Sequence, residues 1–167
     1  FALINVGASW PSKLWHPERF AQVAAHLAEN HGMPSVIVWA GHDERALAQT
    51  VIDQYPECTA LAPRTSRCEL AELARRASLF ISADTGPLHL AAAVGTPCVG
   101  LYGPTRPEIC GPYGQDHVTL QAYYQDGGSR ERRAADNHAM MAIGTDMVAK
   151  ACDQIIGRSK APRIDAA

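Results

Sequence analysis

The stretch Asp84-Thr85-Gly86-Pro87-Leu88-His89 places a carboxylate, a hydroxyl and an imidazole together at the end of an apolar run. It also supplies glycine and proline where a helix would begin, and the first N–H groups of a helix carry about half a positive charge. Gly86 lets an anion approach the backbone closely, and Pro87 suits the first helical turn because it lacks an N–H. His89 follows Gly86 by about one turn and can point back to the same end. We therefore predict an anion-binding site here.

Simpler interpretations of this stretch remain open. Asp84 or Thr85 could serve only as a helix cap, bonding the unpaired N–H groups of the first turn. A single histidine such as His89 is often no more than a packed or solvated side chain. The register of His89 with the turn favours a binding role.

Apolar runs and helical patterns alternate along the chain. Strands are predicted at 1–6, 35–40, 59–61, 79–82, 98–102 and 117–121. Helices are predicted to begin at Pro17, Asp43, Cys68, Gly86 and Asp146. Continuous apolar strands separated by helices require a parallel sheet that is covered on both faces. The predicted fold is therefore α/β, a doubly wound, Rossmann-like parallel sheet.

The chain has 167 residues, of which 47% are hydrophobic, enough for one domain and short for two. We expect that domain over 1–157 and a disordered tail over 158–167. The polar composition of 122–139 predicts a mobile surface segment. The chain begins without Met, directly in an apolar run, so we expect it to be part of a longer protein.

Composition excludes several functions. A net charge of −2 provides no basic field for nucleic acid, so no nucleic-acid partner is expected. Five scattered cysteines without a C-x-x-C pair favour reduced thiols and a cytoplasmic location, and no apolar run approaches a membrane span. The histidines lack metal spacing: His26 and His31 are five apart, share no helix face and are expected to be solvated, so no metal is predicted.

Other polar residues follow neighbouring strands of the predicted sheet. Ser9 and Lys13 follow the first strand, Asp43 and Glu44 the second, and 103–105 the fifth. Each has a simpler explanation: Lys13 could be an ordinary surface lysine, Asp43 and Glu44 could be acids favoured by the helix dipole, and 103–105 could be a simple turn. The carboxyl ends of parallel strands form one ligand-binding edge, so together they favour a site. There is no Rossmann glycine fingerprint and no P-loop, which disfavours a dehydrogenase or an NTPase.

A family resemblance rests on four motifs: N-V-G-A-S-x-x-x-K-x-W-x-P-E-R-F, the D-T-G-P-L-H-L-A-A-A-V-G-T-P run, L-Y-G-P-T and G-P-Y-G. Together they resemble the C-terminal half of the ADP-heptose:lipopolysaccharide heptosyltransferases, glycosyltransferase family 9, which have the two-domain GT-B fold. The match covers about 4–120, with a fainter echo at 138–156.

The resemblance implies a donor-binding site without a metal or a cofactor. Lys13 and Ser9 would meet the diphosphate of a nucleotide sugar, and Asp43 or Glu44 its ribose. The diphosphate and the transferred sugar would be held by the D-T-G-x-x-H group, Asp84, Thr85, Gly86 and His89. ADP-heptose is the favoured donor. Another nucleotide sugar stays open, because 125–138 lacks the clustered cysteines of many relatives.

The resemblance also implies inverting glycosyl transfer in lipopolysaccharide core synthesis. The general base and the surface for a lipid-linked saccharide acceptor would belong to an N-terminal domain that this chain lacks. The chain would then hold no catalytic residue and be inactive alone, and the whole enzyme would work at the inner-membrane face, with peripheral membrane contact. Two alternatives stay open: half of a GT-B nucleotide-sugar 2-epimerase, and a non-catalytic nucleotide-binding module.

Overall fold

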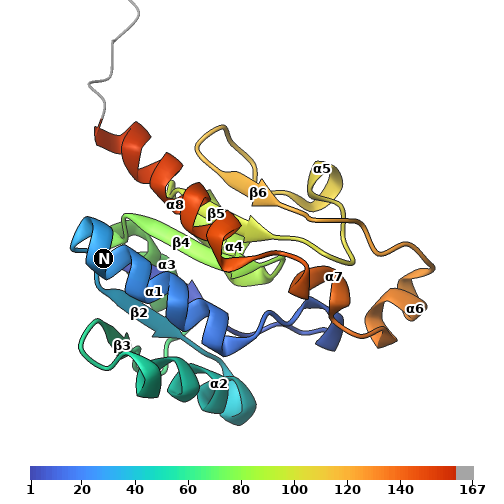
Figure 1. The fold of residues 1–167 in the computed structure, drawn as a ribbon, viewed down its shortest axis with the longest axis horizontal. Helices are drawn as coiled ribbons and strands as arrows, with labels where there is room; N and C mark the ends of the chain where they lie inside the picture. The colour runs from blue at the N-terminus through green and yellow to red at the C-terminus, as the bar shows by residue number, and fades with distance from the viewer. Residues whose placement is uncertain (161–167) are drawn as a thin grey trace, which may run out of the picture.

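The computed structural model describes residues 1–160 and shows a parallel sheet between two layers of helices (Figure 1). The six strands are β1 (Ala2–Asn5), β2 (Ser35–Val38), β3 (Thr59–Leu61), β4 (Leu79–Ala83), β5 (Cys98–Leu101) and β6 (Val118–Leu120). Their order is β3-β2-β1-β4-β5-β6, and every neighbouring pair is parallel. This is the doubly wound order whose direction reverses between β1 and β4. The predicted α/β fold class is confirmed.

Helices cover both faces of the sheet. The long ones are α1 (Pro17–His31), α2 (Gly41–Gln54), α3 (Arg67–Arg76), α4 (Gly86–Ala93) and α8 (Thr145–Lys160). The short ones are the 3-10 turn η1 (Pro11–Lys13), α5 (Pro107–Cys110), α6 (Ser129–Ala134) and α7 (His138–Met141). Helices α1, α2 and α8 pack on one face, and α3 and α4 pack on the other, behind the sheet in Figure 1.

Alternating side chains of the strands fill the two halves of the core. Ile4 and Ile81 point to the α1, α2 and α8 side, whereas Leu3 and Phe80 point to the α3 and α4 side. All four are fully buried. Because both faces are covered, the central strands β1, β4 and β5 are mostly apolar and fully buried, which explains the continuous apolar runs in the sequence.

The segment 122–139 lies mostly at the surface, as expected, but it is not without regular structure. It contains α6 and the start of α7, and both helices contact η1. Its polar side chains attach it to neighbouring backbone: Asn137 donates to the carbonyl of Leu14 at 3.0 Å, and Arg132 donates to the carbonyl of Pro104. The segment is polar in composition, yet burial of Ala139 together with these hydrogen bonds holds it against the rest of the chain.

Helix α8 continues past Gly157 to Lys160, so the expectation of a disordered tail is wrong for 158–160. The rest of that expectation concerns 161–167, which lie outside the described residues. Among the described residues, no helix combines the length and the apolar character that crossing a membrane requires.

Candidate functional site

A cleft of about 720 Å³ opens at the carboxyl ends of β1, β2 and β4. Its wall combines the first loop, the end of β2 and the beginnings of α3 and α4. The residues that line it are Asn5, Gly7, Ala8, Ser9, Val38, Trp39, Ala40, Glu44, Thr65, Ser66, Arg67, Leu70, Thr85, Gly86, Pro87, His89 and Leu90. It therefore lies at the reversal of strand order, where open α/β sheets bind their ligands. Its volume is typical of a small-molecule site.

Lys13, Asp84 and His89 form one charged cluster beside this cleft. The Lys13 Nζ lies 2.6 Å from Asp84 Oδ2 and also donates to the Asp84 carbonyl at 3.1 Å. The His89 Nε2 lies 3.3 Å from the other carboxylate oxygen, Oδ1. The Lys13 and Asp84 side chains are only 10% and 7% exposed, whereas His89 is 43% exposed and lines the cleft. Asp84 thus connects a buried cation to an imidazole that a ligand can reach.

The polar network at the tips of β1 and β4 holds Thr85 in place. The Asn5 amide donates to Ser82 Oγ at 3.0 Å and to Thr85 Oγ1 at 3.4 Å, and these two hydroxyls lie 2.9 Å apart. Thr85 is the residue that precedes α4, yet neither it nor another side chain caps the helix. The simple capping interpretation of this stretch is therefore wrong. The Gly86 end of α4 faces the cleft without a side-chain cap.

The two acidic candidates after β2 lie in different places. Glu44 lines the cleft, and its Oε2 accepts a hydrogen bond from the Ala40 N–H at 2.6 Å. Its carboxylate rests against Gly7, where an added Cβ would lie 2.0 Å from Glu44 Cδ. The Asp43 side chain is fully exposed and lies outside the cleft wall, with its Oδ1 3.8 Å from the His42 Nδ1. Of the pair left open by the sequence, only Glu44 faces the cleft.

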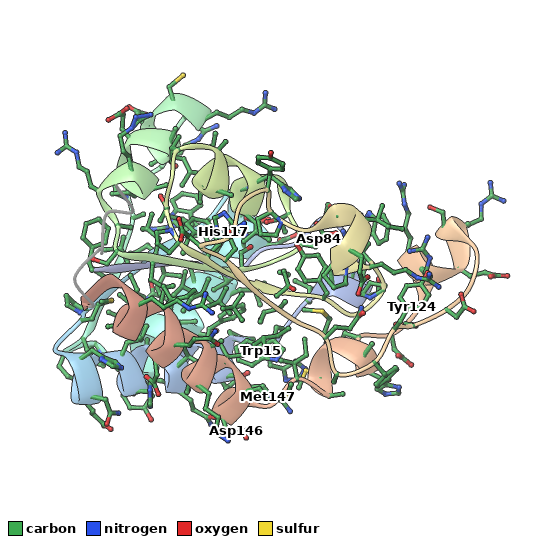
Figure 2. All side chains as sticks on the ribbon, turned by 90° about the horizontal axis from the view of Figure 1, so that it is seen from above. Trp15, Asp84, His117, Tyr124, Asp146 and Met147 are labelled. Carbon is green, nitrogen blue, oxygen red and sulfur yellow. The ribbon has the colours of Figure 1, made fainter. Side chains whose placement is uncertain are left out.

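The first loop contributes Ser9 and is braced from outside by α6. Ser9 is exposed and lines the cleft. The neighbouring Trp10 ring makes cation–π contacts with two side chains. The Lys13 Nζ lies 4.3 Å and the Arg133 guanidinium 4.7 Å from the ring centroid. The candidate turn 103–105 does not line the cleft, and Thr105 in it is buried. Figure 2 shows Asp84 on the side of the molecule where Tyr124 and the short helices lie.

Sequence reasoning missed several residues of the cleft. Trp39 lies directly after β2, and its indole N–H donates to the Ala62 carbonyl at 2.9 Å, which fixes an aromatic face in the wall. Arg67 begins α3 and adds a positive charge to the wall. Trp39 lay inside the predicted strand 35–40, which ends two residues earlier in the structure, and Arg67 comes six residues after the predicted strand 59–61. The loop before α3 was overlooked because β3 is short and its apolar signal is weak.

Behind the site, Tyr102 is a neutral hydrogen-bond donor. Burial raises the pKa of Tyr102 far above its usual range, and the negative charge of Asp84 raises it further. Its hydroxyl donates to the Cys110 carbonyl at 3.1 Å. The charged partner of Asp84 is therefore Lys13 and not Tyr102.

Curated proteins with a similar sequence include lipopolysaccharide heptosyltransferases. Lipopolysaccharide heptosyltransferase 3 of Escherichia coli is 33% identical over 165 residues, which cover 95% of this chain and 48% of the relative. Lipopolysaccharide heptosyltransferase 1 of Pseudomonas aeruginosa is 32% identical over 114 residues, which cover 68% of this chain and 32% of the relative. The chain thus spans half or less of the length of these curated relatives.

Solved structures share the fold. The glycosyltransferase family 9 structure from Veillonella parvula matches with a TM-score of 0.83 and 28% identity, over 94% of this chain and 46% of that one. Two structures of E. coli heptosyltransferase WaaC, both 21% identical, also match. The one with ADP has a TM-score of 0.78 and covers 93% of this chain and 44% of that one. The one with ADP-2-deoxy-2-fluoro heptose has a TM-score of 0.72, and the match covers 95% of this chain and 43% of that one.

The family model for glycosyltransferase family 9 (heptosyltransferase) matches residues 1–139, most of the chain. The match includes the first loop with Lys13 and the strand end with Asp84, the two segments that the structure joins by an ion pair. The chain therefore belongs to glycosyltransferase family 9, the heptosyltransferase family.

Proposed function

We propose that this cleft binds the nucleoside diphosphate and sugar of an ADP-heptose donor in an inverting glycosyltransferase. The observation that carries the proposal is the meeting of Lys13, Asp84 and His89 with the uncapped beginning of α4. The structures of E. coli WaaC with ADP and with ADP-2-deoxy-2-fluoro heptose support this class of ligand.

Each wall of the cleft suits one part of that ligand. The Gly86 N–H, the Ser9 hydroxyl and the helix dipole of α4 favour the diphosphate. Lys13 contributes positive charge from behind, although Asp84 balances part of it. Glu44 keeps one carboxylate oxygen, Oε1, for the ribose hydroxyls, since Oε2 is bonded to the Ala40 N–H.

In the proposed reaction, an acceptor hydroxyl attacks the anomeric carbon and loses its proton to a general base. A new bond forms between the acceptor oxygen and that carbon, while the bond from the carbon to the diphosphate oxygen breaks. The leaving ADP carries the additional negative charge, which the first turn of α4 and Lys13 would stabilise. The base and a lipid-linked acceptor would be held by another part of the whole protein, at the membrane face.

Calorimetry of this chain with ADP and ADP-heptose tests the proposal. We expect saturable binding of both ligands, with ADP-heptose bound more tightly because His89, which lines the cleft, would contact the sugar. Ser9→Ala and His89→Ala should each weaken binding without unfolding the chain, because both side chains are exposed enough to be replaced.

Asp43→Asn is the matched control for Glu44→Gln. The two acids are neighbours on α2, but only Glu44 lines the cleft. Glu44→Gln should weaken ADP binding, and Asp43→Asn should leave it unchanged. Absence of binding at millimolar ligand, or equal losses in the two variants, would refute the proposed donor site.

A further inference from the structure

Two histidines of α1 and one aspartate of α8 meet where these two helices pack together. The His26 Nε2 lies 2.8 Å from Asp153 Oδ1, and the His31 Nε2 lies 2.6 Å from the same oxygen. All three potential ligand atoms lie within 4.8 Å of one another. The two imidazole centroids are 6.0 Å apart, with the rings inclined by 64°.

This arrangement corrects the expectation that His26 and His31 are simply solvated. Residues five apart on a helix point about 140° apart, which made a shared site look unfavourable. The structure overcomes that angle because Asp153 reaches in from a second helix and contacts both rings. The side chains of His26 and His31 are only 28% and 16% exposed.

We propose that His26, His31 and Asp153 bind a divalent transition-metal ion of the zinc class. Two neutral imidazoles and one carboxylate are ligands that Zn²⁺ accepts, and a fourth position would remain for water. With metal–ligand bonds of about 2.1 Å, tetrahedral ligand atoms lie about 3.4 Å apart. The observed spacings, from 2.6 Å to at most 4.8 Å, bracket that value, so small side-chain rotations suffice.

The surroundings also suit an ion. Asn30 Nδ2 lies 3.2 Å from the His26 Nδ1, on the side of the ring away from Asp153. The same Nδ2 donates to the His26 carbonyl at 3.0 Å, so Asn30 holds this part of α1 in place beside the ring. The Asp153 side chain is 43% exposed, which leaves a path for the ion and its water.

An ion here would connect the first long helix of the chain to the last. His31 is the last residue of α1, which leads into the beginning of β2, so the site lies at the edge of the sheet opposite the cleft. Figure 1 shows α1 and α8 side by side on the same face of the sheet, and the two helices are in contact. The ion would therefore act on stability rather than on donor binding.

Calorimetric titration of Zn²⁺ into the tag-free chain, with a reductant present, tests this inference. We expect one equivalent of Zn²⁺ to bind and to raise the melting temperature. His26→Gln and His31→Gln should each weaken the apparent affinity at least about tenfold, since glutamine keeps a hydrogen-bond donor but is a poor ligand. Circular dichroism of each variant checks that it folds.

The matched control is His138→Gln. His138 also pairs with a carboxylate, Asp136 Oδ2 at 3.0 Å, but this pair is exposed and belongs to no three-residue group among the described residues. Its substitution should leave Zn²⁺ affinity unchanged. No saturable binding, or binding unaffected by both His26→Gln and His31→Gln, overturns the inference. ADP binding measured on the same variants separates this result from the donor-site proposal, because neither variant should change it.

Discussion

Removing the charge of Lys13 tests whether the buried ion pair organises the site. Lys13→Met keeps most of the side-chain volume but leaves Asp84 without the partner that now lies at 2.6 Å. Breaking a buried pair by removing one member costs about 3–5 kcal/mol, because the remaining charge is left in a poorly hydrated position. The pair belongs to this buried class, since its side chains are 10% and 7% exposed.

The lower end of that range applies here, since His89 stays 3.3 Å from Asp84 Oδ1 and is partly open to water. We therefore expect Lys13→Met to lower the free energy of unfolding by about 3 kcal/mol. For a chain of this size that corresponds to about 6–12 °C in melting temperature.

Urea denaturation followed by tryptophan fluorescence measures the change. The double variant Lys13→Met with Asp84→Asn removes both charges and should recover more than half of the loss, since replacing a whole buried pair is often nearly neutral. A loss below about 1 kcal/mol for Lys13→Met, the magnitude of a surface pair, would refute the argument. So would a double variant that loses the sum of the two single effects.

Three further predictions concern other parts of the chain. Gly7→Ala should displace the Glu44 carboxylate, because the new Cβ would lie 2.0 Å from Glu44 Cδ. Since the end of the Glu44 side chain is flexible and can rotate away, we expect weaker ADP binding in calorimetry but little change in melting temperature. Burial raises the pKa of the Cys98 and Cys152 thiols to about 12, so Ellman's reagent near neutral pH should label exposed Cys68 quickly and these two only after denaturation. Hydrogen bonds from the backbone N–H and the side chain of Ser66 lower the pKa of Glu69 in the folded chain. The Glu69 carboxylate therefore stabilises the start of α3 at pH values above its unfolded pKa of 4.5, and this stabilisation is lost as the pH falls through the lower folded pKa. The melting temperatures of Glu69→Gln and the unsubstituted chain should therefore converge at acidic pH, and a constant difference would contradict this assignment.

The fold could be predicted from the sequence because its signals are local and repeated. Apolar runs such as 79–82 and the spacing of Phe20, Val23 and Leu27 identify strands and helices without knowledge of their neighbours. The charged cluster was predictable in part, since Lys13 and Asp84 both follow strands whose ends meet at one edge of the sheet.

Other features depend on contacts that no local pattern contains. The meeting of His26 and His31 is determined by Asp153, an aspartate more than a hundred positions later in the chain. Helix α6 is attached to distant parts of the chain, by a hydrogen bond from Arg132 to the carbonyl of Pro104 and by Arg133 over the Trp10 ring. Propensity and periodicity describe neither kind of contact, so composition alone made the first look solvated and the second mobile.

The pairing of β1 with β4 has a kinetic consequence. Lys13 and Asp84 are 71 positions apart, and the Asn5 amide bonds Ser82 across 77 positions, so these contacts appear only when a long loop has closed. Such non-local parallel pairing is intrinsically slow, because closure entropy is lost before the contacts form. During refolding, the cleft at the ends of β1 and β4 should therefore form late, after most of the helical signal has returned.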